Sequence, residues 1–320
     1  MRVLLLALAL TGAFGAAAPA QDYPDRPITL IVPTVVGGGN DAIARALAAS
    51  MSQSLGEAVV PENQGGAGGT IATRDLARSA PDGYTIGIGN SGTMAMGPWL
   101  YPNAGYSPRR DFAPIGLIAS STVVLAVNAA VPATSVQELI ALAKRAPGKL
   151  TYGTGGAGSP GHLFTEMFAD RAGIKLTHVP FRGLGPAMNN LIGGHITMVF
   201  GAFSVAMPHI QAGAIRGLAT TGETRAKEFP DLPTMAEAGL PGYTARQSFG
   251  LLAPAGTPEP IVDKLNAALR LALESDRVKE QLAADGAVAL PGTPEDYARD
   301  IEREEAMWAT FIRGVEPIPK

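Results

Sequence analysis

A glycine-rich stretch near the middle of the chain, YGTGGAGSPGH at residues 152–162, contains residue types suited to three kinds of chemistry. Gly153, Gly155 and Gly158 fit the G-x-G-x-x-G pattern of dinucleotide-binding loops. Ser159 stands one residue away from the G-x-S-x-G arrangement of a serine hydrolase. The third interpretation is an anion site, in which backbone N–H groups and a helix N-terminus hold a carboxylate.

The dinucleotide and hydrolase interpretations each lack a required partner. A dinucleotide site needs an acidic residue about 20 residues after the loop, and the next expected strand, KLTHVP at 175–180, has none. A hydrolase needs a later histidine on a loop beyond the sheet. The candidate histidines lie instead on or beside expected strands: His178, His195 and His209. We therefore expect an anion site and keep the hydrolase as a weaker alternative.

The composition predicts a globular protein with one large domain or two of medium size. Of the 320 residues, 46% are hydrophobic and 17% are charged, with a formal net charge of −3. This balance supplies material for a core and argues against a disordered chain or a nucleic-acid partner. The chain has no cysteine, which excludes thiol catalysis and cysteine-ligated metals, and its four histidines lack metal-ligand spacing. We expect no metal and no cofactor.

Residues 1–20 have the pattern of a secretory signal peptide. Arg2 gives a short positive region, residues 3–14 are apolar, and small residues at 18 and 20 place the cleavage after Ala20. The apolar run is too short to span a bilayer, and an uncleaved anchor or a buried N-terminal helix is the alternative. We expect an exported, soluble mature protein that folds by core burial without disulfides.

Strands and helices are expected to alternate, which predicts an α/β fold. A β-branched strand at 28–32 leads through a loop to a helix capped by Asn40 or Asp41, with apolar residues at 43, 47 and 51 on one face. Ser135 and Glu138 form a capping box. Further strands are expected at 58–60, 84–89, 123–127, 150–152, 174–179, 197–200 and 216–219, and helices at 70–79, 139–145 and 162–171 and after 257 and 293.

Two segments share the plan of strand, glycine loop and helix. They are ITLIVPTVVGGGNDAIARALA at 28–48 and KLTYGTGGAGSPGHLFTEMFA at 149–169. If each belongs to its own lobe, two helix N-termini can face each other across a cleft. Both would then contribute to one anion site.

Many collinear motifs support this arrangement. They are YPDRPITLIVP, GGGND followed by IARALA, NQGGAGG, PDGYT, LYPN, DFAPIGLI, PGKLTYGTGGAGSPGH, HVPFRG, LIGGHI, TGETRA, FPDLPTMAEAGLPGY and APAGTPEPIVDKLN. With them the sequence resembles the Bug family, the substrate-binding proteins of tripartite tricarboxylate transporters. The resemblance extends from Tyr23 to about Trp308, nearly the whole mature chain.

The resemblance implies a type II periplasmic-binding-protein fold without enzymatic activity. Two α/β lobes, at 22–122 with 247–320 and at 123–246, would be joined by two crossover strands with a ligand cleft between them. The protein would bind a small organic carboxylate in the periplasm and deliver it to membrane permease subunits of a tripartite tricarboxylate transporter. A ligand-binding sensor that docks on a signalling receptor is the second hypothesis.

The resemblance also implies which residues contact the ligand. From the first lobe these are Thr34, Val35, Val36, Gly37, Gly38, Asn40, Asp41, Asn90, Ser91, Gly92 and Thr93. From the second lobe they are Thr154, Gly155, Gly156, Gly158, Ser159, His162, Phe181, Arg182, Gly183, Phe200, Gly201 and Ala202.

The first glycine loop departs from the family's usual PFAPGG, because residues 33–38 read PTVVGG. Losing a proline gives Val36 an N–H donor, and losing the aromatic residue at Thr34 adds a hydroxyl. Asp41 either stabilises the helix start or faces the cleft, where it would favour a ligand with an ammonium or hydroxyl donor. Arg182 is either a solvated loop cation or the group that grips a ligand carboxylate with its bidentate fork.

Overall fold

The structure is a computed structural model that describes residues 23–37, 41–101, 103–227 and 229–312. The expected signal peptide at 1–20 lies outside these residues, as do two of the expected site residues, Gly38 and Asn40.

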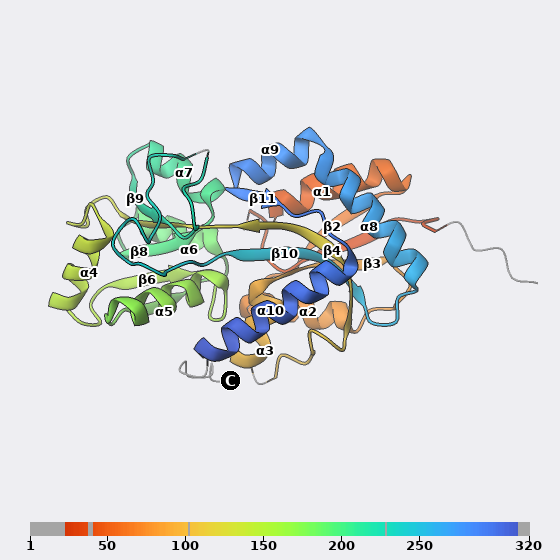
Figure 1. Cartoon of the computed structure of the whole chain (residues 1–320), viewed down its shortest axis with the longest axis horizontal. Coiled ribbons are helices and arrows are strands. Elements are labelled where there is room, and N and C mark those ends of the chain that lie inside the picture. Colours follow the sequence, from red (N-terminus) through yellow and green to blue (C-terminus); the bar gives the residue numbers. More distant parts are fainter. Residues whose placement is uncertain (1–22, 38–40, 102, 228, 313–320) are drawn as a thin grey trace, which may run out of the picture.

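Two α/β lobes lie side by side, each built on its own mixed sheet (Figure 1). The first sheet has the strand order β11-β4-β10-β3-β1-β2, and the second has the order β7-β6-β8-β5-β9. The first contains β1 (Ile28–Val32), β2 (Val59–Asn63), β3 (Thr85–Asn90), β4 (Phe112–Ser121), β10 (Gln247–Pro254) and β11 (Ala287–Ala289). The second contains β5 (Val124–Asn128), β6 (Thr151–Thr154), β7 (Thr177–Pro180), β8 (Met198–Gly201) and β9 (Ile215–Thr220). The predicted fold class is confirmed.

Helices pack around both sheets. Those of the first lobe are α1 (Asp41–Leu55), α2 (Thr70–Ala77), α3 (Gly97–Leu100), α8 (Glu259–Glu274), α9 (Asp276–Ala284) and α10 (Pro294–Ile312). Those of the second are α4 (Val136–Arg145), α5 (Pro160–Ala172), α6 (Leu184–Ile192) and α7 (Phe203–Gln211). The expected apolar stripe of α1 is confirmed, because Ile43, Leu47 and Met51 are buried in one cluster with β1 and β3. Half of the capping box is confirmed, since the Glu138 N–H donates to Ser135 Oγ at 3.2 Å. The Glu138 carboxylate accepts from the Thr134 N–H at 2.6 Å rather than from that of Ser135.

Several expected element boundaries are wrong. The strand expected at 174–179 is confined to β7, because α5 ends at a left-handed Gly173 and the chain must turn before pairing. The strand expected at 58–60 continues to Asn63, since every residue of β1 pairs with it. Helix α5 begins at Pro160 rather than at 162, where the fixed φ of proline suits a first turn. Helices α6 and α7 contain internal prolines and glycines and gave no periodic signal.

The two connections between the lobes are neighbouring strands of the first sheet. β4 and β10 pair antiparallel, and Ser121 lies opposite Gln247 at the point where both leave that sheet. On the second-lobe side, the fully buried Thr221 forms hydrogen bonds to both connections. It exchanges hydrogen bonds of 3.0 Å with Val123, and its carbonyl accepts a third of the same length from the Ala245 N–H. The two connections are therefore linked by hydrogen bonds both where they leave the first sheet and where they enter the second lobe.

Apolar side chains of the first lobe also pack into the core of the second. Met96 and Leu100 share a cluster with Leu163 and Phe164. Trp308 of α10 joins the same cluster and stacks on Phe164, with ring centroids 6.0 Å apart. Burial of this apolar surface stabilises the observed arrangement of the lobes.

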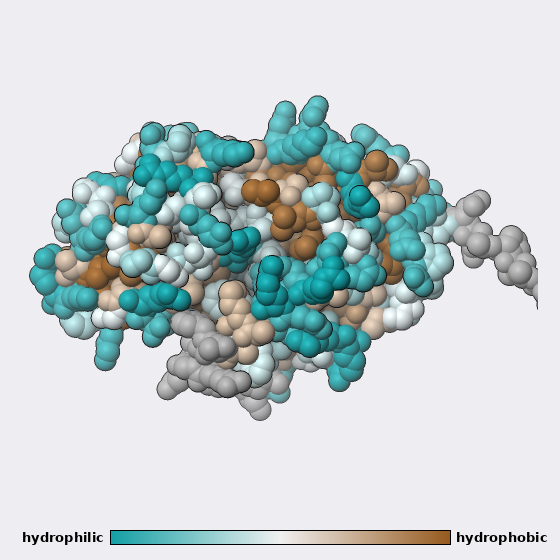
Figure 2. Space-filling view, in the orientation of Figure 1, coloured by the Kyte–Doolittle hydropathy of each residue, from teal (hydrophilic) through white to brown (hydrophobic). Residues whose placement is uncertain are grey.

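The surface drawn in Figure 2 is mostly polar. Its hydrophobic side chains gather beside the crossing strands near β11, where Val288 is 68% exposed. Among the described helices, none combines the length and the hydropathy needed to cross a membrane.

Candidate binding site between the lobes

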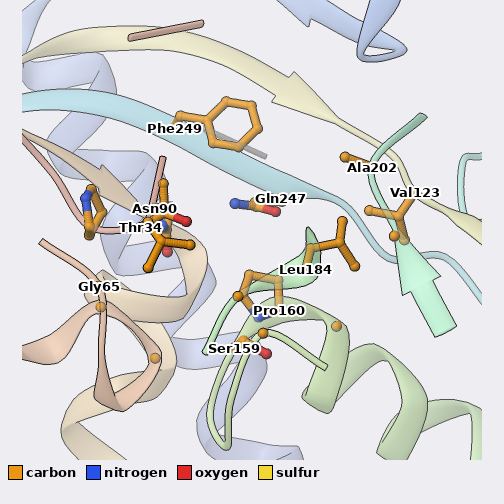
Figure 3. Close-up of a pocket in the computed structure, with 18 of the residues that line it drawn as sticks. Thr34, Gly65, Asn90, Val123, Ser159, Pro160, Leu184, Ala202, Gln247 and Phe249 are labelled. Atoms are coloured by element: carbon orange, nitrogen blue, oxygen red, sulfur yellow. The ribbon is translucent and has the colours of Figure 1, made fainter. Parts of the chain in front are cut away.

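A cavity of about 130 Å³ lies between the two lobes. One water needs about 10–15 Å³ of such space, so the cavity has room for a small organic molecule or several waters. In Figure 3, Thr34, Asn90 and Phe249 come from the first lobe, and Ser159, Pro160 and Leu184 come from the second. The side chain of Gln247, from a connecting strand, lies between them. The carboxyl ends of β1, β3 and β6 all lead into this space, as is usual for ligand sites of α/β proteins.

The two repeated strand–loop–helix units meet here. β1 belongs to the first sheet and β6 to the second, and the loops that follow them both line the cavity. The lobes are in contact at these loops. A Cβ added to Gly68 would lie 2.9 Å from the Ala157 carbonyl oxygen, and one added to Gly183 would lie 2.8 Å from the Val35 side chain. Only glycine permits the two lobes to approach so closely at these points. The lobes are therefore closed over the cavity in the described arrangement.

The second glycine loop uses part of its hydrogen-bonding capacity on itself. The Gly156 N–H donates to Thr154 Oγ1 at 3.2 Å, the Gly158 N–H donates to His162 Nδ1 at 3.1 Å, and the Ser159 N–H donates to the Gly156 carbonyl at 3.2 Å. These three N–H groups shape the loop. Among the residues of this loop and the start of α5, four line the cavity: Gly155, Ser159, Pro160 and Gly161.

The hydroxyl of Ser159 is a side-chain polar group of this loop that is left for a ligand. Its oxygen is buried and has no hydrogen-bond partner among the described residues. An unsatisfied buried polar group costs on the order of 1–3 kcal/mol, which a ligand acceptor would recover. No histidine contacts this oxygen, so the residues described do not form the nucleophile–base pair of a serine hydrolase.

A stack of three rings supports the loop from behind. His162 lies 4.2 Å from His178 between ring centroids, and Tyr152 lies 4.8 Å from His178. Burial lowers the pKa of His162 to about 3 and that of His178 to about 4, and in His162 the neighbouring His178 adds to the effect. Both imidazoles are therefore neutral at pH 7. His162 accepts from Gly158, and His178 Nε2 lies 2.7 Å from Thr154 Oγ1.

Asp41 is committed to its own lobe. Its carboxylate accepts from the Gly37 N–H and the Asn63 amide, each at 2.9 Å, and forms an ion pair with Arg45 at 3.1 Å. Burial alone would raise the pKa of Asp41, but the Gly37 N–H, Asn63 and Arg45 outweigh burial and hold it below the usual value. Asp41 is 5% exposed and does not line the cavity, so the structure places it as a support of the first loop and of α1.

Arg182 lines the cavity from the second lobe. Its side chain is exposed, and it forms no ion pair within the described part of the chain. The guanidinium is therefore available to an anionic ligand.

The expected site residues divide into three groups. Ten line the cavity: Thr34, Val35, Asn90, Gly155, Ser159, Arg182, Gly183, Phe200, Gly201 and Ala202. Eleven do not line it: Val36, Gly37, Asp41, Ser91, Gly92, Thr93, Thr154, Gly156, Gly158, His162 and Phe181. Gly38 and Asn40 lie outside the described residues.

The cavity wall also contains residues that the sequence analysis did not select. The loop 65–69 contributes four glycines, and its sequence NQGGAGG carried a signal, since a run of glycines after a strand predicts a close backbone approach. Gln247 and Phe249 come from a strand that has no local motif. Asp285 follows α9, far along the chain, and nothing near it in the sequence indicates a site.

A cavity enclosed by two α/β lobes that are joined by adjacent strands is the site of a bilobal solute-binding protein. Sequence comparison specifies the family. The family described as "Tripartite tricarboxylate transporter family receptor" matches residues 43–316, and the chain belongs to it. Protein BugT of Bordetella pertussis is 38% identical over 313 residues, which are 96% of this chain and 96% of BugT. The resemblance to the Bug family is thus confirmed.

Two solved structures are similar over nearly their whole length. "R. palustris Rpa4515 with adipate" is 38% identical with a TM-score of 0.88, over 91% of this chain and 98% of that one. MatC from Rhodopseudomonas palustris "with bound malate" is 34% identical with a TM-score of 0.85, over 89% of this chain and 98% of that one. The family is a receptor family of solute-binding proteins, and its structural neighbours are periplasmic.

Proposed function

We propose that this protein captures a small organic carboxylate in the cavity between its lobes and delivers it to the membrane permease subunits of a tripartite tricarboxylate transporter. The observation that carries the proposal is the cavity wall. Ser159 Oγ is buried there without a partner, and Arg182 lines the same cavity without an ion pair in the described residues. Both groups donate hydrogen bonds, which is what a carboxylate requires.

The similar proteins support this class of ligand. Adipate and malate, present in the two solved neighbours, are both small dicarboxylates. Closure of the lobes removes water from around such a ligand and strengthens each contact between a donor and the carboxylate. A micromolar affinity corresponds to about 8 kcal/mol, which several charge-assisted hydrogen bonds can supply.

The family supports the proposed partner and compartment. A receptor of this family implies a transporter in the membrane, and this favours uptake over a role as a sensor or a hydrolase. The pattern at 1–20 accounts for export to the periplasm, with cleavage after Ala20. Mass spectrometry of the N-terminus of the secreted protein tests the cleavage position.

The test is a thermal-shift screen of residues 21–320 against mono-, di- and tricarboxylates, amino acids, aromatic carboxylates and uncharged solutes. A ligand at about a hundred times its Kd adds about 2.7 kcal/mol of stability and raises the Tm by several degrees. We expect every strong hit to carry a carboxylate. A response to uncharged solutes alone would contradict the proposal.

Gly155→Val places a branched side chain in the cavity wall, and we expect the variant to fold but to lose the ligand-induced shift. A Cβ at Gly155 meets only atoms 3.5 Å or more away. Gly185→Val is the matched control, because a Cβ at that position meets nothing within 4 Å and the residue does not line the cavity. Gly158→Val is unsuitable, since Gly158 has a φ of 75° and its Cβ would lie 2.8 Å from Tyr101. Equal ligand shifts in Gly155→Val and Gly185→Val would remove the site from this cavity.

A further inference from the structure

One acidic side chain in the cavity wall, that of Asp285, forms no ion pair among the described residues. Asp285 is 3% exposed and lines the cavity, and neither carboxylate oxygen has a hydrogen-bond partner among the described residues. Its backbone is fixed, because its N–H donates to the carbonyls of Gln281 and Leu282 at the end of α9. A buried carboxylate in this state lacks the pairing that normally accompanies burial.

The position of Asp285 places its charge beside the connecting strands. Two residues later, Ala287 pairs with Ser121, which in turn lies opposite Gln247. The intervening turn packs on the start of α7, since a Cβ added to Gly286 would lie 2.7 Å from the Phe203 ring. Asp285 thus belongs to a different wall from the glycine loop that contains Ser159.

Among the described residues, no cation affects the Asp285 carboxyl group. Burial raises its pKa, and the neutral Ser204 and Gln281 lie close enough to oppose this rise, although neither meets the geometry of a hydrogen bond. No arginine, lysine or histidine is among the groups that affect it. Arg182 and Asp285 are the two charged residues among the described residues that line the cavity.

We propose that Asp285 binds an ammonium group, so that the cavity prefers a small amino carboxylate whose carboxylate is held by Arg182 and Ser159. This inference rests on the proposed function. One positive and one negative group in the wall complement a ligand that carries one of each. A carboxylate ligand without the ammonium would leave Asp285 buried and unpaired, and desolvation of that group would weaken binding.

The test uses pairs of carboxylates that differ only by an α-ammonium group, with residues 21–320 and isothermal titration calorimetry. The pairs are alanine with propionate, aspartate with succinate, and phenylalanine with 3-phenylpropionate, which cover three sizes. In at least one pair we expect the wild-type chain to bind the amino member more tightly, on the order of tenfold to a hundredfold, as for a hydrogen bond to a charged group.

Asp285→Asn is the informative variant because asparagine removes the charge and keeps the shape. Asparagine also keeps an oxygen acceptor in this place, so a purely structural contact with Ser204 at the start of α7 would survive the change. We expect this variant to keep the Tm of the ligand-free protein and to bind both members of the pair with similar affinity. Asp300→Asn is the control, since Asp300 on α10 is also buried but lies outside the cavity wall and the glycine loops, and it should retain the preference.

Two results would overturn the inference. In the first, a carboxylate without an ammonium group binds the wild-type chain as tightly as its amino partner in every pair that binds. In the second, Asp285→Asn keeps the wild-type preference. If either occurs while carboxylates bind, the proposed function stands. If no carboxylate of either kind binds, the proposed function fails together with the inference.

Discussion

Arg182 and Asp41 show that a charged side chain beside a glycine loop takes its role from its neighbours. Both are charged residues next to glycine loops, and both were candidates for ligand contact. Asp41 is saturated by Gly37, Asn63 and Arg45, whereas no ion pair holds Arg182 within the described residues. A charge that is already paired stabilises the protein, and a charge that lacks a partner is available to a ligand.

Arg182→Gln should weaken the binding of carboxylates about tenfold, the lower end for a charge-assisted hydrogen bond because the side chain is exposed. The loss should be smaller at high salt, since screening already weakens the exposed contact. Titration calorimetry at two ionic strengths measures both effects. Arg270→Gln, at an exposed arginine on α8, is the matched control and should leave affinity unchanged. Equal affinities for Arg182→Gln and the wild type would assign Arg182 to the solvated surface.

At the scale of single elements, the ring stack behind the second glycine loop couples the loop to pH. His162 must keep Nδ1 unprotonated to accept from Gly158, and His178 lies against Thr154 of the same loop. Protonation of either ring would place a charge in a buried stack. The loop is therefore held by neutral imidazoles.

The free energy of unfolding should fall as the pH drops from about 6.5 towards 4. Both histidines have a lowered pKa in the folded state, about 3 and about 4, so the unfolded chain binds more protons across this range. Each contributes a slope of up to about 1.4 kcal/mol per pH unit, and the full stability is present above pH 6.5. Urea unfolding at pH 7, 6, 5 and 4 measures this. His162→Gln should reduce the slope, whereas His195→Gln, at an exposed side chain, should not. An unchanged slope in His162→Gln would show that His162 is protonated in the folded protein.

Helices and loops could be predicted from the sequence where the pattern that specifies them lies within a few neighbouring residues. The stripe of α1 and the capping box of α4 depend on residues three or four positions apart, and both were identified. The glycine loops were identified because positive φ and close approach demand glycine. Gln247 and Asp285 could not be found in this way, because the pairing of β10 and β11 with β4 brings them to the cavity from distant parts of the chain.

At the scale of the whole molecule, closure depends on backbones that touch between the lobes. Gly68 faces Ala157, and Gly183 faces Val35. Apolar contacts such as that of Trp308 with Phe164 stabilise the same arrangement. A side chain at one of these glycines would hold the lobes apart and reduce the population that can retain a ligand.

Gly68→Ala should lower ligand affinity tenfold or more and prevent the decrease in radius of gyration that ligand causes in the wild type. The new Cβ would lie 2.9 Å from a carbonyl oxygen of the opposite lobe. Gly173→Ala is the control, because Gly173 has nearly the same φ, 60° against 64°, and its Cβ meets nothing within 4 Å. It should lose about 1 kcal/mol of stability from backbone strain and bind normally. Small-angle scattering with and without ligand provides the comparison, and a normal compaction in Gly68→Ala would contradict the role of this contact.

The pairing of the two connecting strands has a practical consequence. Strands β4 and β10 are hydrogen-bonded to each other, and Thr221 forms hydrogen bonds to both connections on the second-lobe side. We therefore expect the two connections to bend together about a single hinge axis. The hinge angle between the lobes would then describe opening and closing, and any distance measured across the cleft would change with that angle. The chain has no cysteine, so two introduced cysteines would be its sole thiols for attaching a pair of dyes. With one dye on each lobe, energy transfer between them would report the fraction of protein carrying solute, and the protein could serve as an optical sensor of its own ligand.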